Sequence, residues 1–342
     1  SKIDIEEIIA PYVNLRRRGR TYTGLCPFHN EKTPSFTVYP ETQSFYCFGC
    51  GAGGDAITFV RRMDNLDYME AVKSLADRAG LALPQDGYDD TLMKQRRRML
   101  EANREAARYF HETLFTPEGA AALSYLQGRG LNAKIIRHFG LGCAPNRWDG
   151  LLRHMRQKGY SEAELVNANL ARRSDKNGRT SCYDNFRNRM MIPIIDLRGN
   201  VIAFGGRVLD DAKPKYVNTS DTLVYKKSQA IFALNFAKSA NQGKLILAEG
   251  YMDVIAYHQA GFTNAVACLG TALTREQARL LARYADEVIL SYDADGAGQE
   301  ATRRAIGIFN EIGMKLRVLR LSGGKAVSYT HLRAHETTLH LV

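Results

Sequence analysis

The sequence predicts a multidomain protein of the α+β and α/β classes, with a small antiparallel β domain at the N-terminus and a larger mixed α/β region behind it. Three observations predict this order. Cys, Gly and aromatic residues are dense in residues 22–63, the hydrophobic period becomes strand-like from residue 188, and strands alternate with helices from residue 244 onward. Such alternation is typical of helices packed around a parallel sheet.

Length and composition bound the possible classes of protein. The chain has 342 residues, enough for two or three domains, and its 45% apolar content excludes disorder of the whole chain. The sequence contains no run of about 18 apolar residues, so it predicts no membrane-spanning helix, and its first residues show no export signal. The net charge of +11 and the pI near 9.3 predict a polyanionic partner. We therefore expect a cytoplasmic protein with no membrane partner.

Helices are predicted at both ends of the N-terminal domain, which we place at residues 1–82. Four isoleucines within residues 3–9 recur at helical spacing, and Met69–Gly80 is amphipathic and ends at a glycine suited to a helix C-terminus. Residues 83–91 combine Pro, Gly and Asp without periodicity, so we interpret them as an interdomain linker.

The next domain, expected at residues 92–243, begins with helices and turns to β structure. Helices are predicted over residues 92–115, 120–127, 133–139, 149–158 and 162–168. The segments RMMIPIID and GNVIAFGG then predict two strands joined at Arg198–Asn200. Over residues 244–325 we expect a parallel sheet with its helices, and Thr274 with Gln277 fits a capping box at one helix start.

Two ligand pairs in the N-terminal domain predict a metal site. Cys26 with His29 and Cys47 with Cys50 each span two intervening residues, and 17 residues separate the pairs. A tight turn lets both members of a pair converge on one ion, and three Cys with one His hold structural zinc tetrahedrally. Because four protein ligands leave no open coordination position, we predict one structural Zn²⁺ and a zinc ribbon built of antiparallel strands.

Aromatic side chains and Lys32 surround these ligands in the sequence. Phe28 and Phe36 are interpreted as core residues of the small domain. Four others stay open between that core and stacking on single-stranded bases: Tyr39, Phe45, Tyr46 and Phe48. The isolated cysteines are interpreted as small core residues: Cys143, Cys182 and Cys268.

Acidic residues end two apolar strands of the predicted parallel sheet. Glu249 follows the strand LILA, and Asp293 and Asp295 follow VILSY. In open parallel sheets, ligands gather beyond the carboxyl ends of the strands. Oxygen ligands at such a place suit Mg²⁺ (or Mn²⁺), which keeps several waters and bridges phosphates. We predict a magnesium site here; an Asx-rich turn is the alternative for the two aspartates alone.

The basic excess is concentrated in one part of the chain. Residues 172–227 hold twelve Lys and Arg against six Asp and Glu, so +6 of the total +11 lies in 56 residues. This distribution favours one concentrated anionic contact over an evenly solvated basic surface.

Several longer segments follow one another in an order that identifies a family. CPFHNEKTPSFTVYP and FYCFGCGAGGDAITFV come first, followed by YLQGRGL, HFGLGCAP, FRNRMMIPIID, GNVIAFGGR, PKYVNTSDT, EGYMDVIAYHQAG and SYDADGAGQEA. The first two resemble the zinc-binding domain of bacterial DNA primases of the DnaG type. The others resemble the RNA polymerase domain of that family, including its Toprim fold. The resemblance covers residues 1–325.

The resemblance implies synthesis of short RNA primers on a single-stranded DNA template from ribonucleoside triphosphates. It implies that Glu249, Asp293 and Asp295 occupy the acidic positions that hold catalytic Mg²⁺, with Tyr251 and Asp253 in the same motif. The role of Glu249 stays open between a base and a metal ligand. It also implies a basic groove for template and nucleotide, formed by Arg129, Arg187, Asn188, Arg189, Arg207, Lys215 and Lys227. A replicative helicase is the implied partner, through a C-terminal domain outside this chain, and we expect a monomer.

The chain departs from the family pattern after Lys325. The family continues with an Asp-Pro-Asp type segment, whereas this chain has Ala326 and Ser328 at the corresponding acidic positions. One back-translation of residues 327–337 resembles a transposon-end sequencing adaptor. We therefore interpret residues 326–342 as a foreign tail and the chain as a fragment, and we leave open whether the fragment is active.

Two other functions stay open on the sequence alone. One is another Toprim enzyme, a topoisomerase or a nuclease, and the other is a non-catalytic zinc module that binds single-stranded DNA. A cleaving topoisomerase needs a nucleophilic Tyr, which the 17 Tyr of the chain do not exclude. The Cys and His ribbon followed by a basic region favours the primase.

Overall fold

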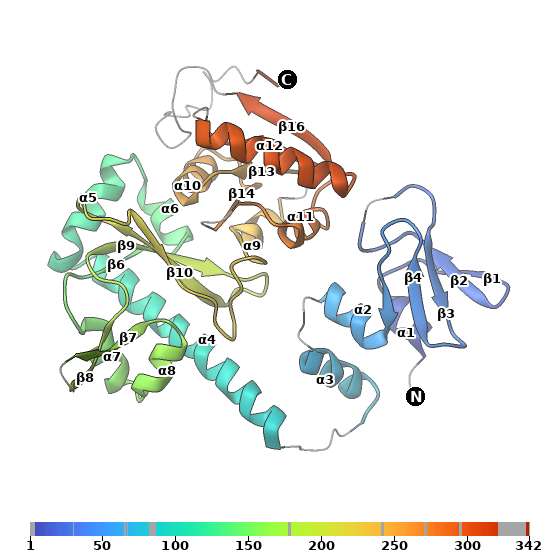
Figure 1. The fold of residues 1–342 in the computed structure, drawn as a ribbon, viewed down its shortest axis with the longest axis horizontal. Helices are drawn as coiled ribbons and strands as arrows, with labels where there is room; N and C mark the ends of the chain where they lie inside the picture. Colours follow the sequence, from blue (N-terminus) through green and yellow to red (C-terminus); the bar gives the residue numbers. More distant parts are fainter. Residues whose placement is uncertain are drawn as a thin grey trace. The chain divides into compact units, whose positions relative to one another are not determined.

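The computed structural model describes residues 4–29, 31–64, 66, 68–81, 87–176, 179–240, 243–269, 272–293, 296–320 and 340–341. By its internal contacts the chain divides into two compact units, Ser1–Leu92 and Met93–Val342 (Figure 1). Among the helices described, none combines the length and the apolar character that crossing a bilayer requires.

The N-terminal unit is an antiparallel sheet with helices packed against it. Its strands run in the order β1 (Arg16–Arg18), β2 (Thr21–Gly24), β3 (Phe36–Tyr39), β4 (Ser44–Cys47) and β5 (Gly53–Asp55). The helices are α1 (Ile5–Ile9), α2 (Ala56–Met63) and α3 (Tyr68–Arg78). Helix α2 begins where it does because the Asp55 side chain accepts a hydrogen bond from the Thr58 N–H.

The core of this unit is aromatic. Phe36 and Phe45 project from β3 and β4 and stack with ring centroids 5.2 Å apart, and Phe59 of α2 meets Phe45 edge-on at 5.5 Å. All three are buried. Such a cluster gives a small domain much of the apolar area that it can bury.

Helices open the second unit, as the sequence predicts. They are α4 (Gly87–Leu114), a 3₁₀ turn at Pro117–Gly119, α5 (Ala120–Gly128), α6 (Ala133–His138), α7 (Gly150–Gln157) and α8 (Glu162–Asn167). Ser161 and Glu164 form a capping box that begins α8.

Helix α4 begins at Gly87, five residues before the predicted helix start at residue 92 and inside the predicted linker, whose role between domains stays a prediction. The residues that follow Pro84 include no further proline before the predicted helix start, so the backbone can continue the helix toward the N-terminus. Residues 82–86 lie outside the described part of the chain.

An antiparallel sheet follows the helices. Its order is β11 (Tyr216–Asn218), β10 (Val201–Val208), β9 (Arg189–Ile195) and β6 (Gly142–Ala144). The predicted turn between β9 and β10 is present, with the N–H groups of Arg198 and Asn200 donating to the Asp196 carboxylate at 2.9 and 2.8 Å. Strands β7 (Ala171–Lys176) and β8 (Arg179–Asp184) form a separate hairpin.

The predicted parallel sheet is also present. Its order is β12 (Ile231–Phe232), β14 (Ala265–Cys268), β13 (Lys244–Ala248), β15 (Glu287–Ser291), β16 (Lys315–Arg320) and β17 (His340–Leu341), with β12 and β17 antiparallel to their neighbours. The helices are α9 (Leu234–Ala237), α10 (Tyr251–Gln259), α11 (Arg275–Leu281) and α12 (Gly296–Glu311). Strand β14 is buried throughout and wholly apolar, as expected for a strand covered on both faces.

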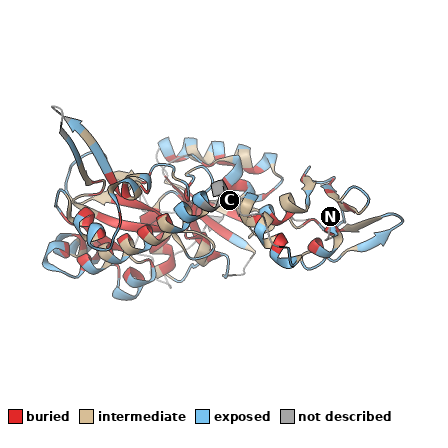
Figure 2. Cartoon of the chain, turned by 90° about the horizontal axis from the view of Figure 1, so that it is seen from below, coloured by how far each residue is buried: buried red, intermediate tan, exposed pale blue. Residues whose placement is uncertain are grey.

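Buried residues follow the strands of both large sheets (Figure 2). The capping box of Thr274 and Gln277 begins α11, as predicted. Cys143 and Cys268 are buried, which confirms them as small core residues, whereas Cys182 is half-buried and packs against the core. The fold class is therefore confirmed. Of the predicted foreign tail, the structure describes His340–Leu341, and the interpretation of that tail stays a prediction.

Candidate active site and metal centre

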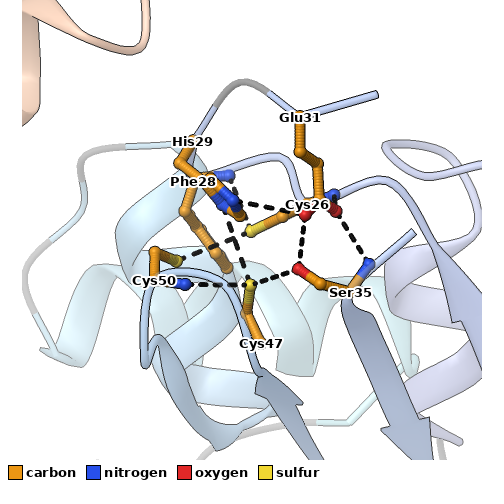
Figure 3. A network of polar contacts seen from close by, with 7 residues as sticks. All are labelled: Cys26, Phe28, His29, Glu31, Ser35, Cys47 and Cys50. Carbon is orange, nitrogen blue, oxygen red and sulfur yellow. Dashed lines mark hydrogen bonds and ion pairs between the residues drawn. The ribbon is translucent and has the colours of Figure 1, made fainter. Parts of the chain in front are cut away.

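The four predicted zinc ligands lie together in the N-terminal unit (Figure 3). Cys26 follows β2, and Cys47 is the last residue of β4. A turn follows each cysteine: the Phe28 N–H points at the Cys26 Sγ at 3.4 Å, and the Cys50 N–H points at the Cys47 Sγ at 3.5 Å. Such turns bring the second ligand of each pair back toward the first.

The geometry of the donor atoms fits one tetrahedral zinc ion. All four lie within 4.8 Å of one another. The Sγ atoms of Cys26 and Cys50 are 3.8 Å apart, and the Cys47 Sγ is 3.7 Å from the His29 Nδ1. Zinc bonds of about 2.3 Å to sulfur give a tetrahedron with edges of about 3.8 Å. The four residues therefore form a zinc site, and their number leaves no position for a reacting water.

The Sγ atoms of Cys26 and Cys50 lie close enough for a hydrogen bond, at 3.8 Å, and either thiol could donate it. The hydrogen bond between them raises the pKa of Cys26, with burial acting in the same direction, and lowers the pKa of Cys50. The lower pKa of Cys50 favours its thiolate, the form that binds zinc.

Two residues beside the ligands were not singled out by the sequence analysis. Glu31 and Ser35 lie against Cys26, His29 and Cys47 (Figure 3). Burial alone would raise the pKa of Glu31, but hydrogen bonds from the Ser35 side chain and from two backbone N–H groups outweigh it and lower that pKa. The carboxylate is therefore charged. The segment CPFHNEKTPSF contains both residues, so its match to the family was the available signal.

The aromatic residues near the zinc site divide between core and surface. Phe28 contacts Phe36 and Phe45 at centroid distances of 6.1 and 5.6 Å, which confirms its place in the core. Tyr46 and Phe48 are exposed instead, at 43% and 69%, and meet edge-on at 5.0 Å. The exposed pair is thus available for contact with another molecule, whereas Phe45 is a core residue.

The acidic residues meet at neighbouring strand ends in the second unit. Strands β13 and β15 are parallel and adjacent, with Ala248 opposite Ser291. Glu249 follows β13 and accepts a hydrogen bond through Oε2 from the Asp293 N–H at 3.0 Å. Glu249 is exposed and Asp293 half-buried. Asp295, the third predicted acidic residue, lies outside the described residues.

The two other residues of the acidic motif are buried. Tyr251 begins α10, and its hydroxyl donates to the Asn218 Oδ1 at 2.8 Å. A Cβ on Gly205 of β10 would lie 2.7 Å from the Tyr251 ring, so glycine is required there for the strand to pass this close. Asp253 is 9% exposed in the same helix. Tyr251 therefore joins the parallel sheet to the antiparallel one two residues after Glu249.

Two of the predicted basic residues meet around one tyrosine. The Arg129 Nε donates to the Tyr125 hydroxyl at 2.9 Å, and the Arg207 guanidinium lies 4.7 Å from the centre of the same ring. Arg207 also donates to the Tyr216 hydroxyl at 3.1 Å. Its Nε is buried and has no hydrogen-bond partner in the described structure. The sequence analysis did not single out Tyr125 and Tyr216, although both lie in segments that match the family, YLQGRGL and PKYVNTSDT.

Three predicted residues lie at one end of the antiparallel sheet. Arg189 donates to the carbonyl oxygens of Gly206 and Pro214 at 3.1 and 3.2 Å, and burial lowers its pKa. Asn188 donates to the Asp210 carboxylate at 2.9 Å. Lys215, which precedes β11, is exposed. Arg189 and Asn188 thus hold the loop that carries Lys215.

The last two predicted basic residues lie elsewhere. Arg187 stacks 4.6 Å from the Trp148 ring and 5.0 Å from the Tyr183 ring. Lys227 is half-buried, and its carbonyl oxygen accepts from Gln277 of α11 at 3.1 Å. These contacts are made with residues outside the cluster around Tyr125.

Family comparisons match three consecutive parts of the chain. A CHC2 zinc finger matches residues 1–90, the N-terminal domain of the DNA primase catalytic core matches residues 109–238, and a Toprim-like domain matches residues 246–328. A zinc ribbon ahead of a Toprim-like sheet with acidic strand ends defines the class: the chain is a zinc-finger Toprim protein.

Individual relatives narrow the class to one family. The DNA primase of Clostridium acetobutylicum is 47% identical over 326 residues, covering 94% of this chain and 54% of the relative. That of Deinococcus radiodurans is 47% identical over 315 residues, covering 91% and 53%. The chain belongs to the bacterial DnaG primase family, and it spans about half the length of the curated relatives it matches.

Solved structures agree with this assignment. The zinc-binding and RNA polymerase domains of the Aquifex aeolicus primase match with a TM-score of 0.62 and 38% identity, over 95% of this chain and 79% of that one. A DnaG primase catalytic domain bound to single-stranded DNA matches with a TM-score of 0.63 and 35% identity, over 69% of this chain and 74% of that one.

Proposed function

We propose that this chain is the zinc-binding and RNA polymerase part of a DNA primase. The intact protein would synthesise short RNA primers on single-stranded DNA from ribonucleoside triphosphates. The observation that carries this proposal is the meeting of Glu249 and Asp293 at adjacent strand ends, joined by a hydrogen bond of 3.0 Å. That edge of a parallel sheet is where such folds bind ligands.

The donor set at this edge fits a hard cation. Glu249 provides an exposed carboxylate and Asp293 a half-buried one, and Asp295 follows Asp293 by two residues in the sequence. In the proposed enzyme these three residues hold Mg²⁺ or Mn²⁺. Such an ion, when bound, stabilises negative charge on a triphosphate during in-line attack by a 3′-hydroxyl. The Asp293 N–H keeps the Glu249 carboxylate turned toward the neighbouring strand, which would position this carboxylate for a bound ion.

Template and nucleotide are the proposed ligands of the basic residues. Arg129 and Arg207 share the Tyr125 ring, and guanidinium groups held in this way are suited to phosphate oxygens. Contacts of Lys and Arg with phosphates give affinity that does not depend on sequence. We include Arg187, Asn188, Arg189, Lys215 and Lys227 in the same proposal.

The remaining parts of the proposal come from the family. The zinc-binding unit would help select the template start, and the exposed pair of Tyr46 and Phe48 is suited to stacking on unpaired bases. A replicative helicase is the proposed partner, through a region outside this chain. We also propose a cytoplasmic, nucleoid-associated monomer.

A primer synthesis assay tests the function. The intact protein is incubated with single-stranded template, Mg²⁺ and ribonucleotides, and RNA oligomers are the expected product. Relaxation of supercoiled DNA or strand cleavage would instead show another Toprim enzyme. Template binding with no product would show a binding module.

A matched pair of variants tests the acidic site. Asp293→Ala should abolish synthesis and leave template binding nearly unchanged, because the proposed binding charge lies on other residues. Asp286→Ala is the control, since Asp286 is exposed and precedes β15 at the opposite end of the same strand. Loss of synthesis in both variants, or loss of template binding in Asp293→Ala, would contradict this division of roles.

A further inference from the structure

The Glu31 carboxylate lies within hydrogen-bonding distance of groups on three residues: Cys26, His29 and Ser35 (Figure 3). Its Oε1 accepts from the Cys26 N–H at 2.7 Å and from the Ser35 N–H at 3.0 Å. Its Oε2 accepts from the Ser35 hydroxyl and lies 3.2 Å from the His29 Nε2. The side chain is only 10% exposed. A carboxylate this buried is stable only when its oxygens are hydrogen-bonded, and here both are.

The contact with Glu31 favours one tautomer of the His29 imidazole ring. The Nδ1 of His29 faces the Cys47 Sγ at 3.7 Å, inside the group of ligand atoms, while the Nε2 faces Glu31. A neutral imidazole that binds zinc through Nδ1 carries its proton on Nε2. A carboxylate oxygen accepts that proton, whereas the opposite tautomer would place two lone pairs against each other.

Ser35 extends the network to a third ligand. Its hydroxyl contacts Glu31 and lies 3.2 Å from the Cys47 Sγ. The Phe48 N–H donates to the Ser35 carbonyl at 2.9 Å, which ties the same residue to the second ligand turn. Glu31 is thus linked to Cys26 and His29 directly, and to Cys47 through one side chain.

Gly49 leaves the space that this arrangement needs. A Cβ at that position would lie 2.6 Å from the His29 Nε2 and 2.8 Å from the Ser35 Oγ. Both distances are shorter than any ordinary contact with a methyl group. The His29 ring and the Ser35 hydroxyl therefore pack directly against the backbone of the second ligand turn.

We propose that Glu31 is a positioning residue of the zinc site, which fixes the His29 tautomer and orientation and, with Ser35, holds three of the four ligands in place. Hydrogen bonds from outside the ligand set commonly orient metal-bound histidines, and losing one typically costs 10–100-fold in metal affinity.

Zinc affinity of the full chain tests this role. Glu31→Gln keeps the size of the side chain but removes its charge and turns an NH₂ group toward one of the donors. We expect its zinc dissociation constant, measured by competition with a chelator, to rise about 10–100-fold. Glu41→Gln is the matched control, because Glu41 lies in the same unit, is 66% exposed and pairs with Arg20 at 3.4 Å. Equal affinity of the two variants would overturn the proposal.

A second readout separates positioning from simple loss of folding. NMR of the zinc-loaded wild-type protein should show His29 bound through Nδ1, with a slowly exchanging proton on Nε2. That proton should exchange faster in Glu31→Gln and remain unchanged in Glu41→Gln. Glu31→Asp keeps a charged acceptor and should retain zinc better than Glu31→Gln. Binding of the wild-type ring through Nε2, or the reverse order of the two Glu31 variants, would refute the assignment.

Discussion

Gly205 gives the sharpest test of how the two sheets of the second unit fit together. In Gly205→Ala the new methyl group would start 2.7 Å from the Tyr251 Cζ and 2.8 Å from its hydroxyl oxygen. Ordinary carbon contacts are about 3.5–4.0 Å, so the ring and the strand must separate by about 1 Å. The ring cannot easily turn away, because Tyr251 is 6% exposed and Phe232 packs edge-on against it at 5.0 Å.

The expected cost combines two effects. Overpacking of a filled core typically costs about 1–3 kcal/mol. Moving the ring also weakens the hydrogen bond from the Tyr251 hydroxyl to Asn218, which contributes about 0.5–1.5 kcal/mol. We therefore expect Gly205→Ala to lower the free energy of unfolding of the second unit by about 2–4 kcal/mol. Primer synthesis should fall as well, because Tyr251 lies two residues after Glu249.

Denaturant unfolding followed by tryptophan fluorescence measures this cost. Trp148 is the single tryptophan of the chain and lies in the second unit, so its emission reports on that unit. Gly307→Ala is the matched control, since Gly307 lies within α12 with open space around its Cβ position. It should raise stability by about 0.5–1 kcal/mol through helix propensity. If Gly205→Ala unfolded at the same denaturant concentration as the wild type, the close packing of Tyr251 would not constrain the fold.

Three further predictions follow from other sites. Tyr125→Phe keeps the ring beneath Arg207 but removes the acceptor of Arg129, so its affinity for single-stranded DNA, measured by anisotropy, should fall about 2–10-fold; an unchanged affinity would exclude a role for this contact. Cys47→Ser should unfold the N-terminal unit, because structural zinc supplies folding free energy; protease resistance equal to that of the wild type would contradict this. Burial raises the pKa of Asp184 to about 6 from 3.8, so the folded state binds the proton more tightly. Stability from this group is complete below about pH 4 and is lost as the pH rises through 6, which amounts to about 3 kcal/mol. The difference in unfolding free energy between wild type and Asp184→Asn should therefore change over that range, and a difference independent of pH would refute the shift.

Local patterns were enough to predict the order of elements and the zinc site. The zinc ligands come as two pairs, each closed by a turn of two residues, so their spacing in the sequence already reflects their geometry. The helices of residues 92–168 and the alternation after residue 244 follow from hydrophobic period in the same local way. The helix start at Gly87 was missed because helix ends depend on weaker signals than helix interiors.

Contacts between segments that lie far apart in the chain could not be predicted from the sequence. The order of strands in the sheet places Glu249 beside Asp293, which lies 44 residues later in the chain. The sequence motifs suggested that the two residues are close, but they could not give the contact between them. Side-chain packing alone puts Arg129 and Arg207 on one tyrosine ring, and Glu31 behind His29. The amino-acid sequence by itself determined which chemical groups this protein has and the local turns that carry them. Only the tertiary structure decided which of these groups form hydrogen bonds with one another or contact the same aromatic ring, because such contacts depend on how separate strands and helices pack in space.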